Sequence, residues 1–304
     1  MRASSYLPLF LLLAACDSSE DSSDTDAGGP VDDGVLDFED LVNVTEEGVG
    51  EFACYTAGDP WITQTVDTAK QVESPASIRI VDFQEDDPVP EASVSFWFAD
   101  DVSTTPDATG VSDANGIVAV DVPACTPTSY LTYTNPDLEA TRDTFEAHQI
   151  FAPPTVDTIE ADINSVSRVT YQLIPSLLGV SPAPDKGVIA GTAYDCAGEP
   201  IRNAQIVVRD ANGAIPQSLI VKYFVDEFPN RDQPATSPDG LWVAINVPEG
   251  TWYVDLYAVR GGTVSLLGTT AVQSFAQSIN ISNVYTGIGD GVKYPESCLV
   301  PSAE

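Results

Sequence analysis

Histidine chemistry in this chain depends on one residue. His148 is the only histidine among 304 residues, so a Ser-His-Asp or Cys-His mechanism would have to use it. No Gly-x-Ser-x-Gly elbow occurs, and the HExxH and CxxC spacings of zinc sites are absent. We therefore expect a structural or exposed His148 and a chain without catalytic residues or a cofactor.

Carboxylate pairs are plentiful, which makes them weak signs of a catalytic site. Glycoside hydrolysis needs two carboxyl groups about 5 to 10 Å apart across a cleft. The pairs at Glu85–Asp87, Asp100–Asp101 and Asp226–Glu227 are more simply explained as solvated loop charges. Asp113–Gly116 resembles the start of a calcium loop, but Val122 stands where the EF-hand pattern requires Glu. We expect a turn there and no metal site.

The charge balance excludes some partners. Asp and Glu number 46 against 12 Lys and Arg, for a formal net charge of -34. Nucleic-acid binding depends on neutralising phosphates with Lys and Arg, and anionic lipid repels an acidic chain. Metal ions, basic proteins and polyamines remain compatible with this charge.

The first sixteen residues have the pattern of an export signal. Arg2 precedes an apolar run at Tyr6–Leu13, and small residues lead to Cys16. The run is about half the 20 residues that span a bilayer, which argues against a transmembrane helix. Leu13–Cys16 resembles the lipobox of bacterial lipoproteins. This resemblance implies removal of residues 1–15, a lipid on Cys16 and attachment to a membrane of the cell envelope.

Residues 16–45 have the composition of a tether. The segment is acidic and rich in Ser and Gly, and no Lys or Arg lies between Arg2 and Lys70. Low hydrophobicity and charge of one sign predict disorder. Calcium binding by these acidic residues is an alternative that we consider weaker than a solvated spacer.

Four cysteines remain after Cys16. An even number of cysteines in an exported chain predicts disulfides, and four allow three pairings. We favour Cys54 with Cys125 and Cys196 with Cys298, since each bridge then lies within one domain. The rival pairings would join the two domains.

Two stretches of the chain repeat one pattern of short strands and turns. Ser77–Phe98 with Ser112–Thr134 matches Gly187–Gly213 with Ser237–Val259. Period-2 alternation predicts strands with one buried face. The fold class is therefore mainly β, with two β-sandwich domains at 46–180 and 187–304. The residues expected on inner faces are Ala92, Val94, Phe96, Phe98, Ala204, Ile206, Val208, Leu241, Val243, Ile245, Val247, Trp252, Val254 and Leu256.

The second copy resembles the carboxypeptidase regulatory-like domain, a transthyretin-like sandwich. The first copy lacks the expected Gly at Glu85–Asp87 and has Cys125 in place of Gly250. The resemblance covers about 120 residues and implies an accessory domain without catalysis of its own. The matching residues are Gly191, Asp195, Gly198, Pro200, Ala204, Asp239, Gly240, Val247, Pro248 and Gly250.

A short helix is expected between the two copies. The residues that recur at helical spacing are Val166, Val169, Thr170, Leu173 and Leu177. Asn164 is the candidate cap and Gly179 the candidate end of this helix. Val169, Tyr171 and Leu173 also alternate as a strand would, and Pro175 would break a long helix. Ser181–Asp185 is expected to be the interdomain linker.

Two features are candidates for binding. Trp97 and Trp242 alternate against inward residues and are expected on outer faces, where they could stack on sugar rings or anchor a protein. The alternative is that the other domain or the segment Asn135–Lys186 covers these faces. The loop Asp226–Pro234, with Asp226 and Arg231, is the second candidate.

These observations favour a non-catalytic, lipid-anchored envelope protein that binds a protein or glycan partner. Two other functions remain open: an envelope hydrolase acting on glycans through loop carboxylates, and a structural surface protein without a specific ligand.

Overall fold

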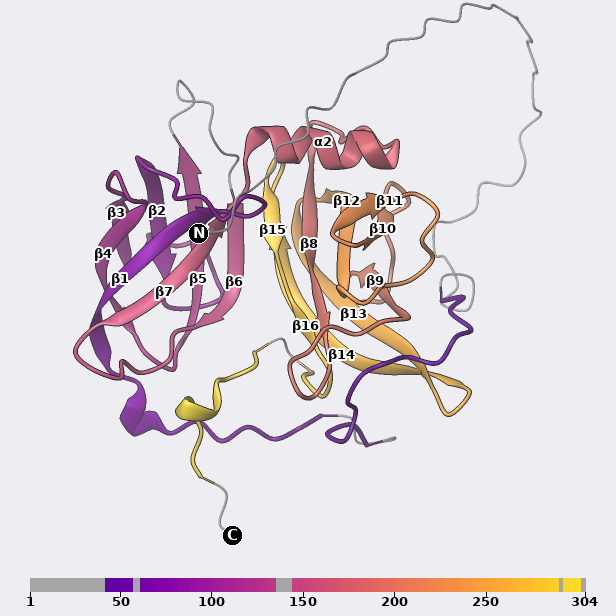
Figure 1. The fold of residues 1–304 in the computed structure, drawn as a ribbon, viewed down its shortest axis with the longest axis horizontal. Helices are drawn as coiled ribbons and strands as arrows, with labels where there is room; N and C mark the ends of the chain where they lie inside the picture. Colours follow the sequence, from indigo (N-terminus) through magenta and orange to yellow (C-terminus); the bar gives the residue numbers. More distant parts are fainter. Residues whose placement is uncertain (1–41, 57–60, 135–143, 290–291, 302–304) are drawn as a thin grey trace, which may run out of the picture. The chain divides into compact units, whose positions relative to one another are not determined.

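The computed structural model describes residues 42–56, 61–134, 144–289 and 292–301, all within one compact unit that extends from Gly34. Cys16, the predicted signal and nearly all of the predicted tether lie outside the described residues. No helix in the described part of the chain is long and apolar enough to span a membrane. The architecture is mainly β, as the sequence predicts, with layered sheets (Figure 1).

The first module is a sandwich of two sheets. One sheet has the order β4-β1-β7, with β1 antiparallel to β4 and parallel to β7. The other has the order β3-β2-β5-β6, and its inner residues Ala92, Val94 and Phe96 are buried in the core as predicted. The strands are β1 (Glu73–Asp82), β2 (Ala92–Trp97), β3 (Ala108–Val111), β4 (Ile117–Pro123), β5 (Pro127–Thr134), β6 (Thr144–Ile150) and β7 (Ile159–Ser165).

The second module repeats this plan. Its β12-β8-β15 order has the same directions as β4-β1-β7, and a β9-β13-β14 sheet packs against it. The hairpin of β10 and β11 extends the first of these sheets. The strands are β8 (Lys186–Tyr194), β9 (Ala204–Arg209), β10 (Ile220–Val225), β11 (Phe228–Asn230), β12 (Leu241–Pro248), β13 (Gly250–Arg260), β14 (Thr263–Ser274), β15 (Ile279–Ile281) and β16 (Val284–Tyr285).

Matching hydrogen bonds confirm that the two copies are in phase. In both modules, the alanine that begins a strand donates its backbone N–H to a side-chain hydroxyl at 2.9 Å. This hydroxyl belongs to a residue four positions before the turn glycine, Gly116 or Gly240. The residue before that alanine has positive φ in both, 58° at Glu91 and 60° at Asn203. The donor–acceptor pairs are Ala92–Ser112 and Ala204–Thr236 (N–H to hydroxyl), and Ile80–Gly116 and Ala193–Gly240 (backbone).

One sheet runs through both modules. β15 pairs in parallel with β8 on one side and with β6 on the other, which gives a ten-stranded sheet among the described residues (Figure 1). Tyr130, Glu146 and Ile281 are register partners and therefore share a face. Tyr130 lies in the first core, whereas Ile281 packs beneath the helix that follows β7. The second core lies on the opposite face of the sheet, with Ile189.

The predicted helix is α2 (Arg168–Leu178). Gly179 ends it as expected, with φ 72°, a left-handed conformation that Gly adopts without strain. The expected cap was wrong, because Asn164 belongs to β7 and the Ser167 side chain accepts the N–H of Thr170. Pro175 lies inside the helix and is buried.

The two ends of the described chain cross between modules. Phe52 packs in the second core, and Gly48 donates its N–H to Val259 O at 3.0 Å, although this segment was assigned to the first domain. In the other direction, Tyr294 and Cys298 pack against the first core. Short 3-10 helices lie in these crossing segments, at Thr68–Lys70 and Glu296–Cys298.

This crossing decides the disulfides. The described chain has bridges Cys54–Cys196 and Cys125–Cys298, with Cα–Cα distances of 5.6 and 5.3 Å. The favoured pairing of Cys54 with Cys125 and Cys196 with Cys298 was therefore wrong. It assumed that each bridge closes within one continuous stretch of sequence, but each terminal segment packs on the other half of the chain. Each disulfide fixes one terminal segment to the module that it contacts.

Candidate functional site

Trp97 and Trp242 do not form an exposed aromatic surface. Trp97 is 5% exposed, and its Nε1 donates to Thr104 O at 2.8 Å. Trp242 is 1% exposed and lies in the second core. Both are corrections to the sequence interpretation. The alternative, cover by the other domain or by residues 135–186, is not what buries them, because Trp242 lies in the core of its own module and Trp97 bonds the loop that follows its own strand.

The error at Trp242 has a topological cause. β12 is buried on both faces, because the second core covers Trp242 and Ala244 while α2 covers Val243 and Ile245. Alternation identifies an outward face only when one side of the sheet meets water. A strand covered on both sides is apolar on both, and its sequence does not reveal which side holds the main core.

The loop Asp226–Pro234 contains the turn of the β10–β11 hairpin and strand β11, and it contacts α2. Asp226 and Glu227 form its turn with φ of 51° and 66°. Arg231 donates from Nε to Leu177 O at 2.7 Å and from a terminal nitrogen to Ser176 O at 3.4 Å. A guanidinium at these carbonyls satisfies groups that a helix end leaves free. In this structure Arg231 holds the hairpin to the helix.

An apolar groove lies between α2, this hairpin and the loop at Phe83–Glu85; we call it the α2 groove. Its volume is about 560 Å³, within the range of about 300 to 1,000 Å³ typical of ligand sites. Phe228 on its rim is 71% exposed, and Leu173 and Leu177 on α2 are 44% and 46% exposed. Its floor includes side chains of the sheet, among them Val188, Val243, Ile279 and Ile281.

The sequence contained a signal for this surface. Val169, Leu173 and Leu177 lie four residues apart, so they form one stripe on α2, while Tyr171, Ile174 and Leu178 pack on the sheet. A helix that is apolar on both faces normally has a partner on each. From the sequence alone, this spacing predicted only a helix, and Phe228 was not named as a candidate.

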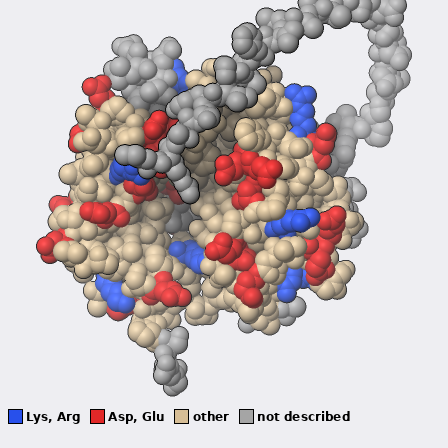
Figure 2. Space-filling model, viewed as in Figure 1, with Lys and Arg blue, Asp and Glu red and all other residues tan. Residues whose placement is uncertain are grey.

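The charged residues that line the groove are acidic. Glu85 and Glu227 line it, and both are exposed. Figure 2 shows Asp and Glu side chains spread over the face in view, with fewer Lys and Arg among them, in keeping with the net charge of -34. A cationic segment would be attracted to this surface at low salt.

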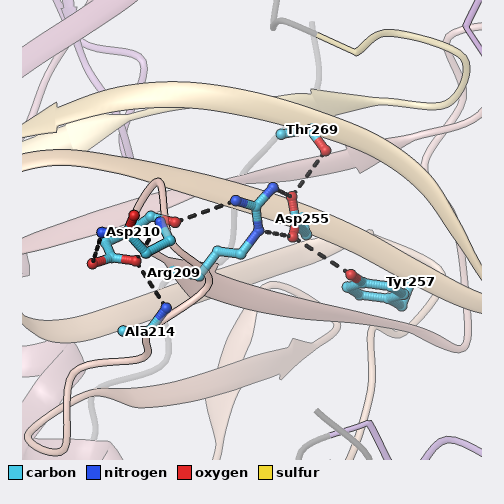
Figure 3. Close-up of polar contacts among 7 residues, drawn as sticks. Arg209, Asp210, Ala214, Asp255, Tyr257 and Thr269 are labelled. Carbon is cyan, nitrogen blue, oxygen red and sulfur yellow. Dashed lines mark hydrogen bonds and ion pairs between the residues drawn. The ribbon is translucent and has the colours of Figure 1, made fainter. Parts of the chain in front are cut away.

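A buried ion pair lies on the outer face of the β9-β13-β14 sheet (Figure 3). Arg209 donates to both carboxylate oxygens of Asp255, at 2.5 and 3.1 Å. Thr269 Oγ1 donates to the same carboxylate at 2.9 Å, and Tyr257 OH lies 3.5 Å from it. The Arg209 guanidinium also lies over the Tyr253 ring.

The electrostatics of this cluster are those of a closed network. The hydrogen bond to Asp255 raises the pKa of Arg209, and desolvation by burial raises the pKa of Tyr257. Next to it, the Ala214 N–H lowers the pKa of the Asp210 carboxyl, whose Oδ1 it bonds at 2.8 Å. Asp255 is 1% exposed and its oxygens are already occupied, so the cluster stabilises the sheet rather than offering a site.

The other candidate carboxylates form neither a catalytic pair between the Asp100 and Asp226 loops nor a metal site in the described part of the chain. Asp113 Oδ1 accepts N–H groups of Asn115 and Ile117, which lowers its pKa and confirms a turn at this position. Asp100 and Asp101 line a different hollow from Glu227, so the two loops do not face each other across one cleft. Among the described residues, no group of His, Cys, Asp and Glu could hold a metal ion. His148 lies on β6, and its side chain is outside what the structure describes.

No family model and no curated protein matches the chain. Among solved structures, the Bacillus anthracis TIE protein is 14% identical with a TM-score of 0.24, over 71% of this chain and 34% of that one. The shaft pilin SpaA of Lactobacillus rhamnosus GG is 11% identical with a TM-score of 0.23, over 73% of this chain and all of that one. BcpA, the major pilin subunit of Bacillus cereus, is 9% identical with a TM-score of 0.22, over 71% and 100%. Similarity at this level assigns neither a family nor an activity.

Proposed function

We propose that this chain is a non-catalytic, lipid-anchored protein of a bacterial cell envelope that docks a partner protein in the α2 groove. The observation that carries the proposal is the exposure of Phe228, Leu173 and Leu177 around a cavity of about 560 Å³. Exposed apolar patches of this kind mark interaction sites more often than isolated apolar side chains do.

The anchor is proposed on the residues at the start of the chain. Arg2, the apolar run and Leu13–Cys16 resemble a lipobox, and the two disulfides suit an oxidising compartment outside the cytosol. Acyl chains on Cys16 would hold the folded part near a membrane, since each buried CH₂ contributes about 0.8 kcal/mol. The acidic tether would keep it at a distance from the lipid.

The joined modules suit a rigid platform. The β6–β15 pairing continues one sheet across both modules, and each disulfide fixes a crossing segment. A groove on such a platform needs little ordering when it binds, which favours affinity. The second module resembles the carboxypeptidase regulatory-like domain in sequence. We therefore propose that it acts as an accessory domain without catalysis of its own.

The groove specifies the partner's chemistry. Apolar side chains would fill the space between Phe228 and Leu173, and Lys or Arg beside them would meet Glu85 and Glu227. The partner segment is therefore apolar with basic flanks. A partner with acidic flanks would be repelled by the same rim.

Peptide binding tests the groove. We would measure fluorescence anisotropy of an amphipathic Leu/Lys helix peptide and of its Leu/Glu counterpart. The Leu/Lys peptide should bind at least tenfold more tightly, and Phe228→Ser or Leu173→Ser should weaken it about tenfold. Val111→Ser is the matched control, since Val111 is exposed on β3 and does not line the groove. Equal binding by all three variants, or no preference between peptides, would refute the docking site.

The anchor has its own test. Intact-mass spectra of the membrane fraction should show the chain beginning at Cys16 with added acyl mass. Cys16→Ser should leave the chain unacylated and in the soluble fraction. An unprocessed amino terminus in the parent protein would overturn the anchor without affecting the groove.

A further inference from the structure

A second hollow lies where the two modules meet; we call it the inter-module cleft. It has a volume of about 230 Å³ and is lined from both sides. The first module contributes the Asp100–Val102 loop, Ser129 and Phe145, and the second contributes residues of β13 to β15. The residues from the second module include Thr251, Ala271, Val272, Gln273, Phe275 and Asn280.

The cleft and the α2 groove lie on opposite faces of the shared sheet. Ile281 packs with the residues beneath α2. Asn280 precedes it on β15, and successive side chains of a strand point to opposite faces. Asn280 therefore faces away from α2, toward the second core, as does its register partner Phe145. These two side chains line the cleft and not the α2 groove, although Ile281 borders both hollows.

Apolar contacts make one part of the cleft. The rings of Phe145 and Phe275 stack with centroids 4.4 Å apart, although they belong to different modules. Val102 and Val272 extend this apolar lining. A ligand here would rest part of its surface against aromatic and aliphatic carbon.

The polar part of the cleft lining includes two buried atoms without hydrogen-bond partners in the part of the chain that the structure describes. Asn280 and Ser129 are each 1% exposed, and Asn280 Oδ1 and Ser129 Oγ have no hydrogen-bond partner among the described residues. The Asn280 amide is held in place, because Nδ2 donates to Val188 O at 3.1 Å and lies 3.3 Å from Ser278 Oγ. The atom left over is an acceptor, so it requires a donor. Buried polar groups in native proteins are nearly always satisfied, which indicates a missing hydrogen-bonding group at this position.

We propose that the inter-module cleft binds one neutral sugar ring of a glycan. Such a ring combines a C–H face, which suits Phe145 and Phe275, with hydroxyl donors for Asn280 Oδ1 and Ser129 Oγ. The volume is below the range of drug-sized sites, so it accommodates a single ring rather than a long segment. Asp100 and Asp101 at the cleft disfavour uronic acids and phosphorylated sugars.

This site is independent of the proposed docking of a protein in the α2 groove. The test is a titration of the whole chain with glucose, galactose, mannose, N-acetylglucosamine and glucuronate, followed by ligand-observed NMR and calorimetry. At least one neutral sugar should bind in the millimolar range, and glucuronate at least tenfold more weakly. Gln273→Ala and Phe275→Ala should each weaken the neutral sugar at least threefold.

Controls keep this test decisive. Asn280→Leu removes the Oδ1 acceptor at a similar side-chain size and should weaken the neutral sugar at least tenfold, and far-ultraviolet circular dichroism shows whether that variant folds. Phe228→Ser alters only the α2 groove and should leave sugar binding unchanged. If no neutral sugar binds saturably, or if Phe275→Ala and Gln273→Ala bind as the parent does, the unpartnered atoms are hydrated by water only and the proposal fails. Such a result would not affect the proposed docking of a peptide in the α2 groove.

Discussion

The two modules share a backbone arrangement but differ in the side chains and loops that cover the outer faces of their sheets. Trp97 and Arg209 occupy equivalent positions, each five residues after the alanine that opens its strand. Trp97 is covered by its own loop and bonds Thr104 O, whereas Arg209 pairs with the buried Asp255. The first module also has an ion pair, Arg79–Asp162, but it is exposed. Turn geometry is thus common to the copies, and what covers each face is specific to one copy.

The largest expected effect separates the two disulfides. Cys125 and Cys298 are fully buried in the first core, whereas Cys54 and Cys196 are only partly buried. Replacing Cys125 and Cys298 by Ala should lower the free energy of unfolding by about 3 to 5 kcal/mol. The same change at Cys54 and Cys196 should cost about 2 to 4 kcal/mol. Urea denaturation measures both, and the reverse order would contradict the role of the first core in holding the carboxyl-terminal segment.

The next effect compares the two ion pairs. Asp255→Asn leaves the partly buried Arg209 without its counter-charge and should cost about 2 to 4 kcal/mol. Asp162→Asn in the exposed pair should cost less than about 1 kcal/mol. Equal losses of stability in urea denaturation would contradict a larger contribution from the buried ion pair than from the exposed one. The double variant Arg209→Met with Asp255→Leu should recover much of the loss.

A smaller effect tests the helix that only one module carries on its outer face. Ser167→Ala removes the side-chain acceptor for the Thr170 N–H and should lower stability by about 1 kcal/mol. Ser176→Ala, in the last turn of α2, is the control and should change stability by less than about 0.5 kcal/mol. Thermal unfolding followed by circular dichroism gives both values. A larger loss from Ser176→Ala would reject Ser167 as the cap.

The smallest expected effect is a change in the pH dependence of stability. Glu146 accepts a short hydrogen bond from Tyr130 at the joint between the modules, and burial raises its pKa above the ordinary 4.5. Between pH 4.5 and this raised pKa, the Glu146 carboxyl keeps its proton in the folded chain and has lost it in the unfolded chain. The stability contributed by neutral Glu146 is complete below pH 4.5 and declines as pH rises through the raised pKa.

Glu146→Gln tests this slope, because the amide stays neutral at every pH. The variant should lose less stability than the parent as pH rises above 4.5. Glu160→Gln, on the exposed side of β7, should retain the parent's slope. Identical pH profiles for the parent and Glu146→Gln would contradict a neutral carboxyl at the joint.

Local patterns predicted much of the fold. Alternation at Ala92, Val94 and Phe96 identified a buried face correctly, and spacing with Gly179 identified a helix and its end. Both signals depend on neighbours within a few residues. The candidate site was less predictable, because Phe228 lines the α2 groove only after a hairpin meets a helix about 50 residues earlier in the chain.

The sequence by itself determined the mainly β class, the repeated module and its turns, whereas the export signal stays a prediction. These follow from composition and from the conformational limits of residues such as Gly and Pro, which act locally. Only the tertiary structure decided the disulfide pairing, the burial of Trp97 and Trp242, and the positions of the groove and cleft. Each of these depends on which distant segment covers a given face, because the free energy of burial does not depend on sequence separation.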